Sequence, residues 1–179
     1  MQKLIRALSI LLFMATLLQA RAWYMMPEDG VLAEQAAVNA IADAQEEIVA
    51  AIYSFTNNSL ARALKEAASR GVKVTLIADE SQIERNPRHH KAGELAKIQN
   101  ITVLVTKGRA SRRGNYHGLM HLKLCIIDNE TIIHGSANWS HNAFNLSHEL
   151  LIIEEDSAWA LALQERLAPI IRQARPYTQ

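Results

Sequence analysis

The sequence predicts a single α/β domain built on a mixed, largely parallel β-sheet with helices on both faces. Three observations support this fold class: apolar runs of strand length, amphipathic segments between them, and a strand–helix–strand succession with short joints. Such a crossover unit joins two parallel strands and packs its helix on the sheet. The chain has 179 residues, of which 49% are hydrophobic and 21% charged, which suits one soluble domain with a real core.

The first half of the domain follows from apolar spacing and turn residues. Residues 31–44 (VLAEQAAVNAIADA) carry apolar side chains at helical spacing and predict an amphipathic helix. Residues 47–55 (EIVAAIYSF) predict a buried strand. After a polar turn, residues 60–70 predict a helix that ends at Gly71, and residues 72–79 (VKVTLIAD) predict the next strand. These segments form the crossover unit.

The second half alternates between loops, short strands and one long helix. Residues 79–91 are polar and predict a surface loop. The elements expected after it are a short helix over 93–99, strands over 101–106, 122–128, 131–134 and 150–154, and a closing helix over 158–172. A basic loop precedes the strand over 122–128, and a turn at 128–130 returns the chain as the strand over 131–134.

Residues 1–22 have the layout of a secretory signal peptide. Lys3 and Arg6 precede an uncharged apolar run over residues 7–18, and Ala20-Arg21-Ala22 has the small-x-small form of a cleavage site. The alternative is an uncleaved anchor, although twelve apolar residues fall short of the roughly 20 that span a bilayer. We expect a periplasmic or secreted domain over residues 23–179, without stable membrane insertion after cleavage.

The expected mature chain has little net charge. Removal of residues 1–22 takes away three basic residues and no acid, which leaves 16 Lys and Arg against 18 Asp and Glu, or −2. A polyanionic partner would therefore have to be held by a local patch. The single cysteine, Cys125, allows no intramolecular disulfide, and its place in a predicted strand indicates a small buried hydrophobe.

Polar residues gather at the start of the predicted strand over 122–128. His121 and Lys123 are two apart and so share one face of the strand. Such a pair at the end of a buried strand is costly unless it meets an anion or a hydrogen-bond network. A phosphate suits both groups, because an imidazole can attack or shuttle a proton and an ammonium neutralises developing charge.

The complete pattern is His121-x-Lys123, four residues, Asp128, six residues, Gly135-Ser136-x-Asn138. It resembles the signature of the phospholipase D superfamily, and residues 51–79 resemble the strand–helix–strand that opens that fold. The short length, single motif and signal peptide are most similar to its small periplasmic endonuclease subfamily. The resemblance covers about residues 31–155.

The resemblance implies a role for each polar residue of the motif. His121 would be the nucleophile and form a phosphohistidine with the scissile phosphate. Lys123, Ser136 and Asn138 would bind the phosphate oxygens. Glu149 would orient a histidine and favour its charged form.

Asp128 belongs to the catalytic motif of the family but would be largely structural, which agrees with its place at a turn.

A single motif is too little for the implied reaction, because displacement through a covalent intermediate needs a nucleophile and a general acid. Larger members of the family carry the motif twice. The resemblance therefore implies a homodimer with two His121 residues facing across a two-fold axis, one neutral and one protonated, and a bell-shaped pH profile.

No metal and no other cofactor is expected, because lysines and histidines supply the positive charge.

The basic loop before the motif contains Lys107, Arg109, Arg112 and Arg113, which could hold flanking phosphates in a sequence-blind, salt-sensitive way. The alternative for this loop is an ordinary solvated surface. His134, His141 and His148 are interpreted as structural or surface residues rather than metal ligands.

The leading hypothesis is a metal-independent endonuclease that cleaves nucleic acid, DNA and possibly RNA, without sequence specificity. The nearest alternative is the same chemistry on phospholipid headgroups, which would need an apolar approach to the site. A third hypothesis is a nucleic-acid-binding protein that keeps the fold without turnover.

Overall fold

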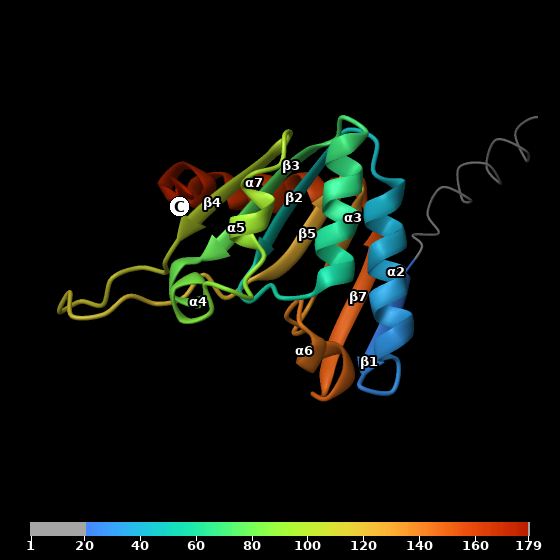
Figure 1. The fold of residues 1–179 in the computed structure, drawn as a ribbon, viewed down its shortest axis with the longest axis horizontal. Coiled ribbons are helices and arrows are strands. Elements are labelled where there is room, and N and C mark those ends of the chain that lie inside the picture. Colours follow the sequence, from blue (N-terminus) through green and yellow to red (C-terminus); the bar gives the residue numbers. More distant parts are fainter. Residues whose placement is uncertain (1–20, 179) are drawn as a thin grey trace, which may run out of the picture.

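The structure is a computed structural model and describes residues 21–178, which form one eight-stranded sheet with helices on both faces (Figure 1). The strands are β1 (Arg21–Met26), β2 (Glu47–Ile52), β3 (Lys73–Asp79), β4 (Ile101–Thr106), β5 (Lys123–Ile127), β6 (Thr131–Gly135), β7 (Glu149–Glu155) and β8 (Arg175–Pro176). The helices are α2 (Gly30–Asp43), α3 (Asn58–Ser69), α4 (Glu80–Arg85), α5 (Ala92–Leu95), α6 (His141–Asn145) and α7 (Ser157–Gln173).

The strand order is β1-β7-β6-β5-β2-β3-β4-β8, and the predicted mixed α/β class is confirmed. The β2–β3 and β3–β4 pairs are parallel, as the crossover unit requires. The other pairs in this sheet are antiparallel, so the expectation that parallel pairing would dominate is wrong. The physical reason is the hairpin succession of β5, β6 and β7, which places neighbouring strands in alternating directions.

Alternating side chains of β2 supply the core on both faces of the sheet. Ile48, Ala50 and Ile52 pack with the buried faces of α2 and α3, which cover one side of the sheet in Figure 1. Val49 and Ala51 pack on the opposite side, together with residues of α7. Burial on both faces explains why this strand reads as an unbroken apolar run.

Capping side chains set the helix starts. The Asn57 side chain accepts a hydrogen bond from the Leu60 backbone N–H, and Asp156 does the same for Trp159 at the start of α7. Gly71 ends the α3 connection with a φ of +101°, a conformation that favours glycine. The polar turn before α3 and Gly71 after it were the sequence signals for the bounds of this helix. The long elements begin and end near the expected residues.

The segment over 79–91, expected to be a surface loop, instead contains the helix α4 and the buried residue His90. The Asp79 side chain caps this helix, and Gln82 and Ile83 are buried. A helix of six residues is too short to show apolar periodicity in a sequence, which is why it was missed.

The strand β1 was also not predicted. It is an edge strand, antiparallel to β7, with Trp23 opposite Ile152. Residues 1–20 of the predicted signal peptide lie outside the described part of the chain. Cleavage after Ala22 remains a prediction, and it would remove the first two residues of β1.

Strand directions bring six strand ends to one end of the sheet, which we call the site end. It is formed by the last residues of β2, β3, β4 and β6 and the first residues of β5 and β7. Open α/β sheets characteristically bind ligands beyond the carboxyl ends of their parallel strands. The site end therefore gathers the loops in which polar side chains can converge.

Candidate active site

His121 and Lys123 lie together at the site end, where the chain enters β5. The Lys123 Nζ is 3.1 Å from both ring nitrogens of His121 and donates a hydrogen bond to the His121 carbonyl oxygen at 2.8 Å. His121 is exposed, whereas Lys123 is only 9% exposed. The two predicted residues are therefore in contact, with the imidazole exposed to solvent and the ammonium buried beside it.

The electrostatics of Lys123 are set by two opposing effects. Burial lowers the pKa of the Lys123 ammonium because it disfavours the charged form, while the negative charge of Glu149 raises it. Glu149 begins β7 and is close enough to interact with Lys123 although β6 separates their strands. An anion placed at this ammonium would offset part of the cost of its burial.

Ser136 and Glu149 form the second half of the cluster. The Ser136 hydroxyl donates a hydrogen bond to the Glu149 carboxylate and accepts one from the Leu150 backbone N–H at 3.1 Å. This approach of β6 to β7 depends on Gly135, which has a φ of +144° and whose Cβ, if added, would lie 2.1 Å from the Leu150 carbonyl oxygen. The glycine of the motif is therefore required by backbone geometry.

Asn138 lies in the loop after β6, which is bonded to the loop after β2. The Trp139 backbone N–H donates to Ser54, and its carbonyl oxygen accepts from Thr56 and Asn57. The Asn138 Oδ1 is buried and has no hydrogen-bond partner within residues 21–178. Buried polar atoms without a partner are rare and often mark functional sites.

Asp128 is remote from this cluster, because it lies at the opposite end of β5. Its carboxylate accepts hydrogen bonds from the backbone N–H groups of Gln45, Glu46 and Glu47 at 2.8, 2.8 and 2.9 Å. Burial alone would raise the pKa of Asp128, but these three donors outweigh it and hold the pKa below the usual value. The residue joins the β5–β6 turn to the α2–β2 connection.

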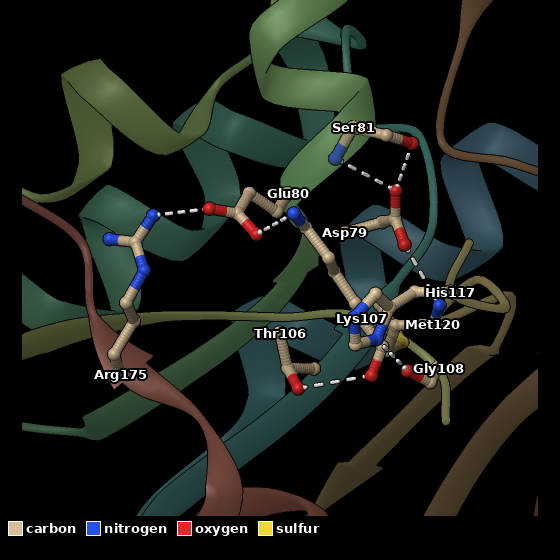
Figure 2. Close-up of polar contacts among 9 residues, drawn as sticks. All are labelled: Asp79, Glu80, Ser81, Thr106, Lys107, Gly108, His117, Met120 and Arg175. Carbon is tan, nitrogen blue, oxygen red and sulfur yellow. Dashed lines mark hydrogen bonds and ion pairs between the residues drawn. The ribbon is translucent and has the colours of Figure 1, made fainter. Parts of the chain in front are cut away.

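Asp79 is a site residue that sequence reasoning missed. It is fully buried at the end of β3, and its Oδ2 accepts a hydrogen bond from the Met120 backbone N–H at 2.8 Å (Figure 2). Its Oδ1 accepts from the backbone and hydroxyl of Ser81. Because Met120 precedes His121, Asp79 fixes the backbone from which the imidazole projects. An aspartate ending a buried parallel strand was the available signal.

Tyr53 and Gln82 were missed as well. The Tyr53 ring centroid lies 4.4 Å from that of His121, and the Lys123 Nζ lies 5.0 Å from it. Gln82 belongs to α4, the helix hidden in the supposed loop, and its Nε2 donates to the Tyr53 hydroxyl at 2.8 Å. No sequence signal pointed to this pair, because the contact crosses from β2 to an unrecognised helix.

The basic loop is a hairpin over residues 107–118 that extends from the body of the protein (Figure 1). Its arms meet at Gly108 and Gly118, where the Gly108 N–H donates to the Gly118 carbonyl oxygen at 2.8 Å. A Cβ added to Gly108 would lie 2.5 Å from the Gly118 carbonyl carbon. Glycine at position 108 therefore permits the close crossing at the hairpin root.

The cations of this hairpin fall into two groups. Lys107, at the root, pairs with Glu80 at 2.9 Å, and Glu80 also pairs with Arg175 at 2.6 Å (Figure 2). The Glu80 carboxylate raises the pKa of Lys107. Farther out, the arginines are exposed and form no side-chain ion pair within the described part of the chain; they are Arg109, Arg112 and Arg113.

A cavity of about 560 Å³ lies between the hairpin root and the end of α7. His121 contributes to its wall, together with apolar residues and two cations of the hairpin. Leu119 and Leu122, which flank the motif histidine and line this cavity, are 46% and 37% exposed. The site thus has a polar cluster and an adjoining partly apolar hollow.

Two of the remaining histidines, His134 and His90, have partners outside this cluster. His134 bonds to the buried Glu154 at 2.7 Å, and the buried His90 accepts a hydrogen bond from the Ala92 backbone N–H at 3.1 Å. Between residues 21 and 178, no three His, Cys, Asp or Glu side chains are grouped as metal ligands would be. In the same range, no helix is both long and apolar enough to cross a membrane.

Comparison with known proteins places this geometry in a family. Residues 37–171, about three quarters of the chain, match the family described as cardiolipin synthase, PLD-like domain. The mitochondrial cardiolipin hydrolase of Xenopus laevis is 28% identical over 135 residues, or 75% of this chain and 59% of that protein. The chain therefore spans about six tenths of the length of this relative.

Two solved structures share the fold over nearly their whole length. NucT from Helicobacter pylori is 33% identical, with a TM-score of 0.84, and the match covers 89% of this chain and 99% of NucT. Nuc from Salmonella typhimurium, a phospholipase D family member, is 26% identical with a TM-score of 0.72, over 90% of this chain and 99% of that one. The chain therefore belongs to the phospholipase D superfamily, as a member with one copy of the motif.

Proposed function

We propose that the protein is a metal-independent phosphodiesterase that cleaves nucleic acid without sequence specificity, through a phosphohistidine on His121. The observation that carries the proposal is the convergence of His121, Lys123, Ser136 and Glu149 at the site end of the sheet. Membership in the phospholipase D superfamily supports phosphodiester chemistry for this cluster.

The first chemical step forms a bond between a His121 ring nitrogen and phosphorus. The neutral imidazole attacks, the bond from phosphorus to the leaving oxygen breaks, and a general acid protonates that oxygen. The Lys123 ammonium, 3.1 Å from the imidazole, is placed to neutralise charge on the non-bridging oxygens. The side-chain amide of Asn138, in the loop after β6, can donate hydrogen bonds to the same non-bridging oxygens.

The second step regenerates the enzyme. A water molecule attacks phosphorus and gives its proton to the group that acted as acid, the nitrogen–phosphorus bond breaks, and a phosphomonoester leaves. Each chain supplies one His121, so the nucleophile and the acid come from two copies related by a two-fold axis. Within residues 21–178, Glu149 bonds to Ser136 and not to the His121 of its own chain, which leaves its carboxylate suited to orient the histidine of a second copy.

Exposed apolar side chains around the site support this homodimer. Leu119 and Leu122 flank His121 in the sequence and are both exposed, although they precede a fully buried strand. Burial of these groups against a second copy would bring two histidines together and remove apolar surface from water.

The hairpin favours nucleic acid as the substrate. Its three arginines (Arg109, Arg112 and Arg113) have no ion pair within residues 21–178 and precede His121 by 8 to 12 positions, and Arg109 lines the same cavity as His121. Arginine binds phosphate in a sequence-blind way. The partly apolar cavity and the likeness to a cardiolipin hydrolase favour a phospholipid headgroup as the second candidate. Export to the periplasm or secretion is also part of the proposal, and it is supported by the sequence pattern of residues 1–22.

A comparison of the two substrates tests this assignment. The protein is incubated in excess EDTA with labelled DNA and RNA oligonucleotides and, separately, with vesicles containing cardiolipin. We expect cleavage of the oligonucleotides and a large rise in KM when Arg109, Arg112 and Arg113 are replaced by glutamine. Hydrolysis of cardiolipin alone, unaffected by these replacements, would assign the site to the lipid headgroup instead.

The shared site is tested by mixing copies. Wild-type chains are unfolded and refolded with a growing excess of His121→Ala chains, and the activity per wild-type chain is measured. A site that needs two histidines predicts that this specific activity falls towards zero as mixed dimers replace wild-type dimers. A constant specific activity would show that one histidine is enough.

A further inference from the structure

Tyr53 occupies a position between the motif pair and the helix α4. It follows directly after β2, and its backbone N–H donates to the Leu122 carbonyl oxygen at 2.8 Å, which continues the β2–β5 pairing to the site end. Its ring is 4.4 Å from the His121 ring between centroids, with a tilt of 57° between the planes. The tyrosine ring therefore contacts the imidazole from a position that the backbone pairing fixes.

The same ring faces the Lys123 ammonium at 5.0 Å from its centroid. An aromatic face attracts a cation electrostatically, and more strongly when the cation is removed from water. Lys123 is buried, so water screens its attraction to the ring only weakly. One ring thus contacts both members of the His121–Lys123 pair and limits the directions in which either can turn.

The ring itself is held by α4. Gln82, which is buried, donates its amide hydrogen to the Tyr53 hydroxyl at 2.8 Å. The start of α4 is fixed in turn by Asp79, which bonds to Ser81 on one carboxylate oxygen and to the Met120 backbone on the other (Figure 2). Two routes, one through Tyr53 and one through Met120, therefore tie the short helix to the residues around His121.

We propose that Tyr53 is a positioning residue of the active site, which holds His121 and Lys123 in the geometry for attack and is itself aimed by Gln82. The inference rests on the proposed function, because it assigns a role relative to the reaction of His121. It predicts that the aromatic ring carries most of the effect and that the hydroxyl contributes through its bond to Gln82.

Kinetics of three variants separate these contributions. Tyr53→Phe keeps the ring and loses the bond to Gln82, Tyr53→Leu loses the ring, and Gln82→Leu loses the support alone. We expect kcat to fall about threefold in Tyr53→Phe and Gln82→Leu and about 30-fold in Tyr53→Leu, with KM changed less than threefold, since misplacement of reacting groups is costly. Tyr177→Leu, which removes a partly buried tyrosine ring elsewhere, is the control for loss of packing.

The pKa of Lys123 supplies a readout that a purely structural role would not change. The groups that face the Lys123 ammonium are His121, Glu149 and the Tyr53 ring. Replacement of the ring by leucine removes the attraction for the cation and keeps the site apolar. The pKa of the Lys123 ammonium, followed by NMR, should therefore fall by about half a unit in Tyr53→Leu and stay in place in Tyr53→Phe.

The outcomes distinguish this inference from the proposed function. If wild type cleaves nucleic acid in EDTA, His121→Ala does not, and Tyr53→Leu keeps full kcat while its circular dichroism and melting temperature match wild type, the role of Tyr53 is refuted and the proposed function stands. If Tyr53→Leu is poorly folded, kcat values of Tyr53→Phe and Gln82→Leu equal to that of wild type would refute it. An inactive wild type would overturn the proposed function itself.

Discussion

Replacement of Asp128 separates the structural aspartate of the motif from the residues proposed to react. Its carboxylate receives three backbone hydrogen bonds of 2.8–2.9 Å, all at the end of β5 away from His121. Charge-assisted bonds of this kind are worth about 1.5–3 kcal/mol each when buried, and about 1 kcal/mol is the better figure at this half-exposed position. Asp128→Ala should therefore lower the free energy of unfolding by about 3 kcal/mol.

For a domain of this size that loss corresponds to a fall in melting temperature of about 6–12 °C. Asp128→Asn keeps one acceptor oxygen and should cost about half as much. The pKa of Asp128 is below its usual value in the folded protein, so its stabilisation is present above about pH 4 and is lost as the pH falls through the lowered pKa. The alanine variant should lack this part of the acid dependence.

The assay combines urea unfolding with kcat/KM on oligonucleotides at 25 °C, where the variant remains folded. The exposed Asp43, at the end of α2, provides a control: Asp43→Ala should change neither quantity appreciably. An unchanged stability of Asp128→Ala with a large loss of kcat would refute the reasoning, because it would make Asp128 a participant in the reaction.

Three further predictions follow from named contacts. Gly135→Ala should cost at least about 2 kcal/mol of unfolding free energy and most of the activity, because its Cβ would collide with the Leu150 carbonyl oxygen; stability and activity equal to wild type would contradict this. Burial lowers the pKa of His90 to about 4, so stability should fall by up to about 3 kcal/mol as the pH drops from 6.5 to 4, and His90→Leu should remove that slope in urea titrations. Arg112→Gln with Arg113→Gln should reduce the slope of log KM against log salt by about 1.5, and an unchanged slope would show that these arginines do not meet phosphate.

The long elements were predictable because burial of one face makes apolar residues recur at a regular spacing along the sequence. The strand over residues 101–106 was predicted to the residue, and the helices α2, α3 and α7 within two residues. Cys125 is buried, as its place in an apolar strand indicated, and burial raises the pKa of its thiol. Short elements such as α4 and β8 carry no such period, because they are fixed by tertiary contacts.

The residues of the candidate site also fall into a group that could be predicted from the sequence and a group that could not. Residues within one motif, such as His121, Lys123 and Ser136, could be found because the family fixes their spacing along the chain. Tyr53, Asp79 and Gln82 come from three other segments, and only the parallel order of β2 and β3 brings them to the site end. The pairing of Lys107 with Glu80 was hidden for the same reason, because it joins the hairpin to a helix that the sequence did not reveal.

Digestion of plasmid DNA and single-stranded RNA in excess EDTA, with wild type and His121→Ala purified side by side, tests the central claim most directly. The account predicts that wild type cuts without added metal and that His121→Ala, with the same fold by circular dichroism, does not cut at all. Equal cutting by both proteins, or cutting by wild type that stops in EDTA and returns with a divalent metal, would contradict it.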